Sequence, residues 1–488
     1  MSKSTKKTDY IIISEDIPSV MISESLLDNS WSAASVQPKF FLNALSIRAS
    51  NLDVTQLGNV AFVTDGPFGS DLKVSDYRDT GIPVFRVADV VDLELRTINL
   101  VFISDEKHRK LKRSEVLPRD VLITKAGRIG SATVVPDFIE RGNITSHLCL
   151  VRLNDNRDPY YLAAYLECRI GRIESLRQSF KATRPELSAA EVKKIEVPWP
   201  KPSVQKVIGS RVRDALQYLH QADELQDNAE KLFSREIDLL SLSRRLAELD
   251  SDIWNWVSID DIQGRWDAEF FQKRNHALLK HLKAHNSIRL ERLIKKPRKG
   301  KQPEYASDPS SENLVPVLNG SEIDPYFIDI EKAGKVSRAF HSVHAASALE
   351  IDDIVLTVTG PPLGEAALVR KHHLPCNINT HVVKIKAKQG VYPGYLTVVF
   401  NSPIGQMQVY QWCRGIRQKD LYPDQIMRFF FPILDEKTME EIDRKIKDAE
   451  DKRGEARRLL RQAKQEIEDL IEGRIDGETI LKRAQADL

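Results

Sequence analysis

Positive charge is concentrated in one short stretch in the second half of the chain. Five of the seven residues from 295 to 301 are cations, in the sequence KKPRKGK. Cations spaced this closely suit the phosphate backbone of a nucleic acid, and binding of that kind weakens steeply with salt. The alternative is a solvated, mobile loop. The cations are Lys295, Lys296, Arg298, Lys299 and Lys301, and the equivalent stretch of the first half, GPFGSDLK, ends in Lys73.

Two further basic turns occupy matching places, each just before a helix start and a final strand. Forked and amide side chains can bond base edges, and cations neutralise phosphates. The alternative interpretation for both turns is solvated surface charge. The residues concerned are Lys181, Thr183 and Arg184 in QSFKATRPELS, and Arg414, Arg417, Gln418 and Lys419 in WCRGIRQKDL.

A glycine-bearing turn follows a strand in each half, KAGRIG at 125–130 and TGPPLG at 359–364. Exposed backbone N–H groups in such turns can hold a phosphate. Lys125 and Arg128 favour that role for the first turn. The second has no cation and its two prolines remove donors, so a purely structural tight turn is the favoured interpretation there.

Two histidines also match, His147 in NITSH and His381 in NINTH. Each could bond a base or a phosphate, or fix its loop internally, and the structural role is favoured. The pairs His341 with His344 and His372 with His373 lack a convincing set of companion ligands. We therefore predict no metal site.

These residues sit in a sequence that is written twice, at a shift of about 234 residues. Asp120 opens DVLITKAGRIGSATVV, and Asp353 opens DIVLTVTGPPLGEAALV. NITSH then aligns with NINTH without a gap, and PYYL with PGYL. One shift kept through separate blocks, at this period, indicates a duplicated domain plus linker.

Each copy is rich in short β-type runs punctuated by turn residues and followed by short helices, which predicts an α+β unit. In the N-terminal segment only Phe40 and Phe41 find a counterpart, in Phe270 and Phe271. The expected division is an N-terminal segment at 1–50, a first recognition domain at 51–201, a central helix at 202–250, a second recognition domain at 251–434, a C-terminal helix at 435–475 and a tail at 476–488.

Both copies end in a long charged stretch whose apolar residues recur as heptads, which predicts two long helices. Alanine at three successive like positions permits close approach of two backbones, so each helix is the simplest partner of the other. Packed antiparallel, helices of about 40 residues would form a rod about 60 Å long, a ruler between the two units. The alternative is two ordinary amphipathic helices on separate domains. The predicted interface comprises Ile208, Val212, Ala215, Leu219, Ala222, Ala229, Phe233, Ile442, Ile446, Ala449, Ala456, Leu460, Ala463 and Ile467.

Composition limits the remaining function classes. The 488 residues contain 72 Lys and Arg against 70 Asp and Glu, so any nucleic-acid surface must be a local patch. The four cysteines form no CxxC pair, which favours a reducing cytoplasm over a zinc site or a disulfide framework. No apolar run approaches the roughly 20 residues of a membrane span. We expect a cytoplasmic protein without membrane contact.

Motifs of catalysis are absent from the sequence. It lacks a GxxxxGK[ST] phosphate loop, a [DN]PP[YF] adenine-methyltransferase signature, an FxGxG cofactor loop, HExxH and GxSxG. We therefore predict a chain that performs no catalysis itself and has no catalytic residue.

The order of these blocks resembles the specificity (S) subunit of Type I restriction-modification enzymes. The resemblance covers roughly residues 40 to 475 and rests on WDAEFF at 266–271, GIPVFRVADV, the D-hydrophobic-hydrophobic-T-x-x-G segment, the basic turn before the last strand and the duplication. It implies that each unit reads one half of a split double-stranded DNA site, with the paired helices setting the spacer.

The resemblance also implies partners. Two methyltransferase subunits that use S-adenosylmethionine would dock on the helices, and restriction subunits that use ATP and Mg²⁺ would join that complex. This chain would hold no cofactor. Because the two halves differ in nearly every candidate contact residue, we expect an asymmetric target. The alternative is a scaffold subunit of another defence system that does not read bases.

Overall fold

The computed structural model describes residues 10–14, 19–22, 37–97, 100–179, 185–249, 268–308, 311, 313–415 and 417–486, with side chains described from residue 37 on. The chain forms two compact units. Unit 1 comprises Met1–Leu219 and Glu455–Leu488, and unit 2 comprises His220–Gly454. Each unit therefore includes part of both long helices, whereas the sequence had suggested separate helical domains.

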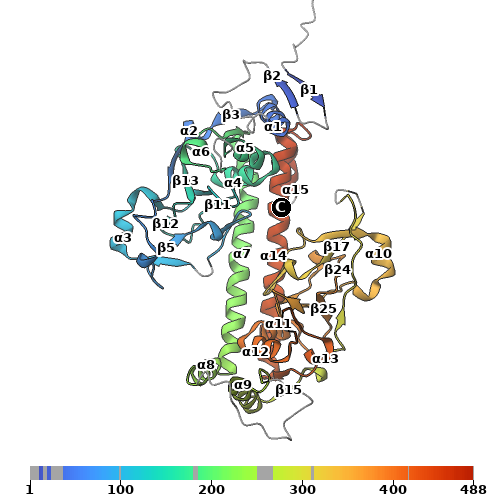
Figure 1. The fold of residues 1–488 in the computed structure, drawn as a ribbon. Coiled ribbons are helices and arrows are strands. Elements are labelled where there is room, and N and C mark those ends of the chain that lie inside the picture. Colours follow the sequence, from blue (N-terminus) through green and yellow to red (C-terminus); the bar gives the residue numbers. More distant parts are fainter. Residues whose placement is uncertain are drawn as a thin grey trace, which may run out of the picture. The chain divides into compact units, whose positions relative to one another are not determined.

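Unit 1 is built on two small sheets (Figure 1). The first has the order β11-β10-β13-β4 and is antiparallel throughout, and the second has the order β8-β5-β12-β9 with one parallel pair, β12 with β5. Helix α4 packs against β11, and α5 packs against α1 and α4. The strands are β4 (Ala61–Asp65), β5 (Ile82–Phe85), β8 (Val101–Ile103), β9 (Glu115–Val116), β10 (Val121–Thr124), β11 (Ala132–Val134), β12 (Gly142–Ile144) and β13 (Leu148–Leu153), and the helices are α1 (Pro38–Ala49), α2 (Leu57–Val60), α3 (Asp105–Lys110), α4 (Pro159–Glu167), α5 (Arg169–Ser179) and α6 (Ala189–Val192).

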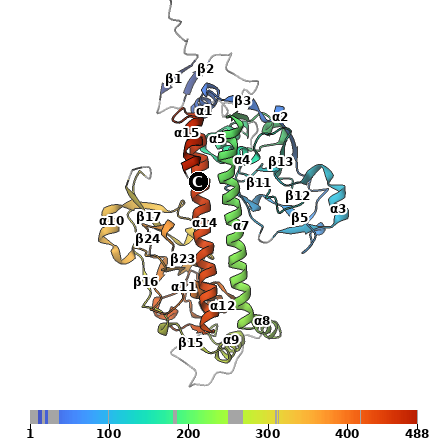
Figure 2. The ribbon, with the colours of Figure 1, turned by 180° about the vertical axis from the view of Figure 1, so that it is seen from behind.

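Unit 2 repeats this plan (Figure 2). Its sheets have the orders β16-β25-β21-β23 and β20-β17-β24, again with one parallel pair, β17 with β24. Helix α11 packs against β23 and α12. The strands are β16 (Arg298–Lys299), β17 (Leu314–Leu318), β20 (Gly334–Ser337), β21 (Ile354–Thr357), β23 (Ala366–Leu368), β24 (Asn377–Ile378) and β25 (Val382–Ile385), and the helices are α9 (Lys273–Ala284), α10 (Arg338–Val343), α11 (Pro393–Asn401), α12 (Pro403–Trp412) and α13 (Pro423–Ile426).

Smaller pairs complete both units. In unit 1, β3 (Asp53–Gln56) pairs with β14 (Glu196–Trp199), β6 (Val90–Val91) with β7 (Glu94–Leu95), and β1 (Tyr10–Ser14) with β2 (Ser19–Ile22). In unit 2, β15 (Ser287–Arg289) pairs with β27 (Phe430–Pro432), β18 (Ile323–Asp324) with β19 (Phe327–Ile328), and β22 (Thr359–Gly360) with β26 (Lys419–Asp420).

Strand register in the two units matches residue by residue. Thr124 pairs with Leu148 in unit 1, and Thr357 pairs with Val382 in unit 2. Tyr161 in α4 donates its hydroxyl to the carbonyl of Pro198 at 2.5 Å, and Tyr395 in α11 does the same to Pro432 at 2.6 Å. The self-match in the sequence therefore corresponds to two units with equivalent strand pairing.

The long helices are α7 (Pro202–Glu236) and α14 (Glu436–Ile471), and they pack antiparallel within each unit. In unit 1, Arg211 is 3.3 Å from Glu466, and in unit 2, Arg453 is 3.0 Å from Asp223. Every residue of the expected interface is buried except Leu219, which is partly buried. The small alanines lie on the buried face, where they permit close backbone approach.

The central helix is shorter than expected. Helix α7 ends at Glu236, and a separate helix, α8 (Leu239–Ala247), follows. The break lies at Asp238, whose φ of 47° is left-handed and whose carboxylate accepts a hydrogen bond from Ser241 N–H at 3.3 Å. An aspartate in this conformation ends one helix and caps the next, so the sequence pattern overestimated the length of α7.

Two end segments also differ from expectation. The predicted tail contains α15 (Gly477–Ala486), whose Ile480 is fully buried in the unit 1 core. Phe40 lies inside α1, whereas Phe270 precedes the equivalent helix α9. The two phenylalanine pairs are therefore not at equivalent positions, although Phe40 and Phe270 are both buried. Among the described residues, no helix is both long enough and apolar enough to cross a bilayer.

Candidate nucleic-acid interface

Three loops of unit 1 and the segment at Leu187 meet at one end of its first sheet. A Cβ on Gly66 would lie 2.1 Å from the carbonyl oxygen of Thr145, so only glycine permits this approach. The N–H of Lys125 donates to the carbonyl of His147 at 2.9 Å, and the N–H of Leu187 donates to the carbonyl of Lys125 at 3.1 Å. The stretches that contain the predicted contact residues are therefore neighbours.

Unit 2 brings its equivalent loops together by the same contacts. A Cβ on Gly300 would lie 2.0 Å from the carbonyl oxygen of Ile378. The N–H of Val358 donates to the carbonyl of His381 at 2.9 Å, and the N–H of Leu421 donates to the carbonyl of Val358 at 2.8 Å. We call these two loop clusters the unit 1 loop cluster (66–73, 125–130, 145–147) and the unit 2 loop cluster (295–301, 358–364, 379–381, 414–420).

The described cations of the unit 1 loop cluster are mostly engaged within the protein. Lys125 is only 9% exposed, and its Nζ lies 2.9 Å from Asp65 and 3.6 Å from Glu186. Burial raises the pKa of Asp65, yet the bonds from Lys125 and Cys149 outweigh burial and hold this pKa below its usual value. Lys125 therefore fixes the loop instead of presenting an open charge. Arg128 pairs with Asp92, Lys73 is exposed, and Lys181, Thr183 and Arg184 lie outside the described residues.

The cations of the unit 2 loop cluster are largely exposed. Lys296 is 3.1 Å from Asp424 and Lys419 is 3.4 Å from Glu269, while the Nζ of Lys299 lies 5.2 Å from the centre of the Tyr422 ring. Such exposed pairs exchange readily with water and salt. The other predicted residues here, Lys295, Arg298, Lys301, Arg414, Arg417 and Gln418, have exposed side chains.

Among the residues that the structure describes, the matched histidines His147 and His381 hold their loops through backbone groups. Their carbonyls accept hydrogen bonds, and their side chains are exposed. The asparagine four residues earlier has the structural role instead: Asn143 bonds His108 Nδ1 at 2.6 Å, and Asn377 bonds His341 Nδ1 at 2.6 Å.

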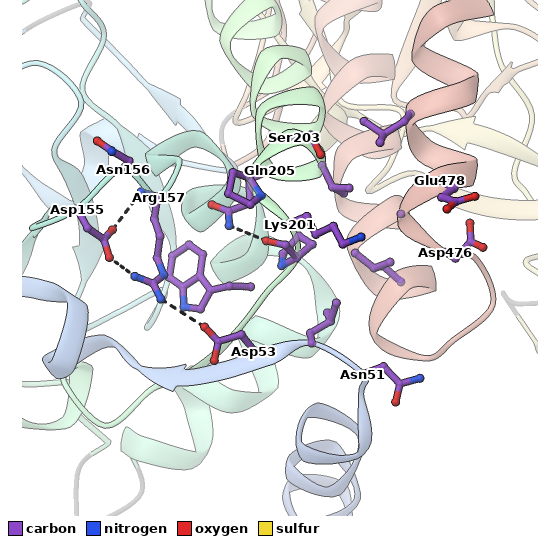
Figure 3. A pocket seen from close by; sticks show the side chains of 18 residues that line it. Asn51, Asp53, Asp155, Asn156, Arg157, Lys201, Ser203, Gln205, Asp476 and Glu478 are labelled. Carbon is purple, nitrogen blue, oxygen red and sulfur yellow. Dashed lines mark hydrogen bonds and ion pairs between the residues drawn. The ribbon is translucent and has the colours of Figure 1, made fainter.

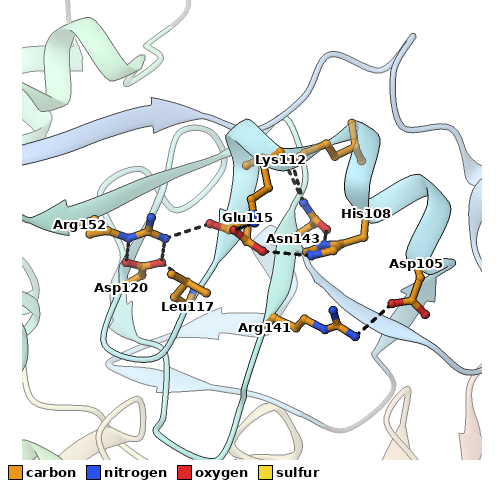
Figure 4. A network of polar contacts seen from close by, with 11 residues as sticks. Asp105, His108, Lys112, Glu115, Leu117, Asp120, Arg141, Asn143 and Arg152 are labelled. Carbon is orange, nitrogen blue, oxygen red and sulfur yellow. Dashed lines mark hydrogen bonds and ion pairs between the residues drawn. The ribbon is translucent and has the colours of Figure 1, made fainter.

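Unit 1 also contains a polar network that was not predicted from the sequence (Figure 4). His108 bridges Asn143 and Glu115, and Arg152 binds Asp120 with both contacts at 2.7 Å. Asp120 also accepts the N–H of Leu117 at 2.7 Å, just as Asp353 accepts that of Glu350 at 2.8 Å. The signal was present, since His108 and His341 share the repeat spacing. These side chains connect α3 with β9 and β12, and β13 with the turn before β10.

The pair His372 and His373 gains a companion, because both lie near Glu450 of α14. The three potential ligand atoms are within 4.8 Å of one another. The N–H of Arg370, however, donates to Nδ1 of His373 at 3.1 Å. In a neutral ring the other nitrogen then carries the proton and cannot bind a metal. Glu450 is also 2.5 Å from Arg453, so this cluster is poorly suited to a cation.

A pocket of about 1000 Å³ lies at the start of α7 in unit 1 (Figure 3). Arg157 lies 5.1 Å from the Trp199 ring and 3.4 Å from Asp53. Acidic side chains outnumber cations around it, and Asp476 and Glu478 line the opposite side. This balance does not favour phosphate binding.

The geometry thus defines a class of protein, an α+β chain with two similar units, each presenting a cluster of loops at the end of a sheet. No family model matches it. The specificity subunit of the Type I restriction enzyme EcoBI from Escherichia coli is 28% identical over 157 residues, which is 32% of this chain and 32% of that protein. The chain is therefore similar to a Type I specificity subunit, HsdS-like, over about one third of that relative's length.

Two solved structures align over most of both chains. The S subunit of a Type I restriction-modification system from M. genitalium is 12% identical, covering 87% of this chain and 96% of that chain with a TM-score of 0.43. The HsdS subunit from Thermoanaerobacter tengcongensis is 11% identical, covering 86% and 97% with a TM-score of 0.29.

Proposed function

We propose that this chain is the DNA-recognition subunit of a Type I restriction-modification complex and binds a split, asymmetric site. The observation that carries the proposal is the pair of loop clusters, built by equivalent backbone contacts but bearing different side chains. Equivalent frames with different side chains suit two half-sites of different sequence. The sequence similarity to the EcoBI specificity subunit supports the same proposal.

The recognition residues we propose in unit 2 are the exposed cations, together with Gln418 and His381. In unit 1 they are Lys73, Arg128 and His147, with Lys181, Thr183 and Arg184 from the turn outside the described residues. Lys125 has a supporting role, because its charge is bound to Asp65.

The chain performs no catalysis in this proposal and holds no cofactor. Two methyltransferase subunits that use S-adenosylmethionine bind the paired helices, and restriction subunits that use ATP and Mg²⁺ join through the complex. The missing catalytic motifs support this division of labour.

Selection from random duplex DNA tests the proposal. The full chain, alone and with the methyltransferase from its own operon, is incubated with a random library at fixed salt, because affinities depend on salt. We expect enrichment of two different short motifs at a fixed separation. Binding without enrichment of any motif would instead support a scaffold that does not read bases.

A matched pair of variants then assigns the half-sites. His147→Ala and His381→Ala change exposed side chains at equivalent positions. We expect each variant to relax one half of the enriched motif and leave the other half intact. Relaxation of both halves by either variant would contradict independent reading by the two units.

A further inference from the structure

The edge strands of the two equivalent sheets differ in the charge of their side chains. In unit 1 strand β4 has the sequence AFVTD, and the segment that aligns with it in unit 2 has the sequence KKPRK. The basic run is therefore equivalent to β4 and not, as predicted from the sequence, to the GPFGSDLK stretch that follows β4. The registers agree, since Asp65 pairs with Cys149 and Lys299 pairs with Val383, 234 residues further on in both cases. An acidic residue in unit 1 and a lysine in unit 2 therefore occupy the same place.

The unit 2 edge is fixed in position and open to solvent. The N–H of Lys301 donates to the carbonyl of Ile378 at 3.2 Å, and the close approach at Gly300 holds the strand end against the loop of His381. Lys295, Arg298 and Lys301 are exposed. Lys296 contacts Asp424, but the two side chains are 69% and 77% exposed, so the pair is screened and readily exchanged.

The unit 1 edge has a different electrostatic character. The carboxylate of Asp65 lies 2.9 Å from Lys125, and Glu186 lies near the same ammonium group. Arg113 also contacts this edge, since its Nε donates to the hydroxyl of Thr64 at 3.1 Å. Phe62, at the place of Lys296, is 46% exposed.

Resting on the function proposed above, we infer that unit 2 anchors the DNA backbone through the 295–301 edge, whereas unit 1 makes few phosphate contacts from its edge strand and contributes mainly discrimination. Phosphate contacts supply affinity and salt dependence without reading sequence, and base contacts supply specificity. The two half-sites therefore contribute unequally to affinity. Unit 2 supplies most of the affinity for the duplex, and unit 1 discriminates between correct and incorrect sequences in its own half-site.

Salt titration of DNA binding by the full chain tests this division. Each neutralised phosphate contributes about 0.9 to the slope of log K against log salt. The unit 2 variant is Lys295→Gln, Lys296→Gln and Arg298→Gln, and the unit 1 variant is Lys73→Gln, Arg113→Gln and Arg128→Gln. A third variant, Arg274→Gln, Lys280→Gln and Lys283→Gln, removes three exposed cations from α9 as a control for total charge.

On a random-sequence duplex, we expect the unit 2 variant to lower the slope by about 2 to 3 and the affinity by more than about 10-fold. The unit 1 and α9 variants should each lower the slope by less than about 1. All variants should keep the wild-type circular dichroism and thermal midpoint, since the changes are on exposed side chains. Equal slope losses in the unit 1 and unit 2 variants, or a larger loss in the unit 1 or α9 variant, would overturn the inference.

The same wild-type sample separates this inference from the proposed function. If selection enriches a split motif and the slopes fall equally, only the anchoring inference fails. If no motif is enriched, the recognition function fails, and with it the assignment of discrimination to unit 1.

Discussion

Asp443 on α14 accepts a hydrogen bond from the backbone N–H of Gly394 at 2.6 Å, and so caps the first turn of α11. In unit 1 the equivalent helix α4 is capped by its own neighbour, Asp158, which accepts from Tyr160 at 2.8 Å. The position equivalent to Asp443 is Gly209, where a Cβ would lie 2.4 Å from Asp158 Oδ1. Each unit thus caps the equivalent helix with one carboxylate, which comes from α14 in unit 2 and from the residue before α4 in unit 1.

Asp443→Ala is expected to destabilise the protein by about 1 to 2 kcal/mol, because the cap on α11 is lost. The exposed Asp448 on the same helix provides the control, and Asp448→Ala should change stability by less than about 0.5 kcal/mol. Urea unfolding followed by circular dichroism measures both. Equal effects of the two substitutions would refute the capping role.

The capping carboxylate of unit 1 can be moved by a paired substitution. Gly209→Asp alone should destabilise, because it places a second carboxylate against Asp158. Combined with Asp158→Ala, the new carboxylate can take over the cap, so the double variant should be more stable than the sum of the single changes predicts. A double-mutant cycle on unfolding free energies gives the answer. Additivity would mean that the two positions do not exchange roles.

The buried alanines between α7 and α14 are not expected to tolerate a larger side chain. Ala222→Leu in unit 2 and Ala456→Leu in unit 1 each introduce a bulky side chain at a fully buried site and should cost about 1 to 3 kcal/mol. Gln217→Leu, at an exposed position of α7, is the matched control and should have little effect. Unfolding midpoints in urea would show the difference, and methyltransferase binding should weaken with the buried substitutions only.

Glu365 gives stability a pH dependence. Burial, and then the charge of Asp324, raise the pKa of Glu365 from 4.5 to about 7. A raised pKa means that the folded state holds the proton more tightly, so this contribution to stability is fully present below about pH 4.5 and is lost as the pH rises through about 7.

Glu365→Gln should therefore stabilise the protein by about 1 kcal/mol at alkaline pH, a modest gain because the side chain is only partly buried and water screens it. At acid pH the variant and the parent should be equal. Chemical denaturation across this pH range measures the effect, with the exposed Glu304→Gln as the control. A constant difference at every pH would exclude titration of Glu365 as the cause.

Metal removal is expected to change nothing. His373 Nδ1 accepts the N–H of Arg370, so the nitrogen that would bind zinc carries a proton in the neutral ring. Treatment with EDTA should leave the thermal midpoint unchanged. Stoichiometric zinc in the purified protein, measured by elemental analysis and lost in His372→Ala, would contradict this prediction.

The long helices are predicted to set the spacer of the DNA site. Inserting one heptad into both α7 and α14 keeps their packed apolar faces in register and adds about 10 Å of helix. At about 3.4 Å per base pair, the preferred spacer should lengthen by up to about three pairs if the helices lie along the duplex. Selection from a library of spacer lengths is the readout. An unchanged preferred spacer would mean that the helices do not set the spacer length.

The sequence by itself determined the repeated plan of the protein. The shared spacing of Asp120 with Asp353 and of Asn143 with Asn377 predicted two α+β units, and the heptads predicted the buried face of both helices. These features follow from local periodicity, because side chains on one face of a helix or strand recur at fixed intervals. The sequence also marked the loops that meet at the sheet ends.

Only the tertiary structure decided which of those loop cations are buried in ion pairs within the protein. Lys125 and Lys299 look alike in the sequence, yet Lys125 is bound to Asp65, 60 residues earlier, whereas Lys299 lies over the Tyr422 ring on an edge strand. The break at Asp238 and the companion role of Glu450 likewise depend on backbone conformation and on distant contacts. Ion pairing and burial arise from residues far apart in the chain, and no local pattern in the sequence records them.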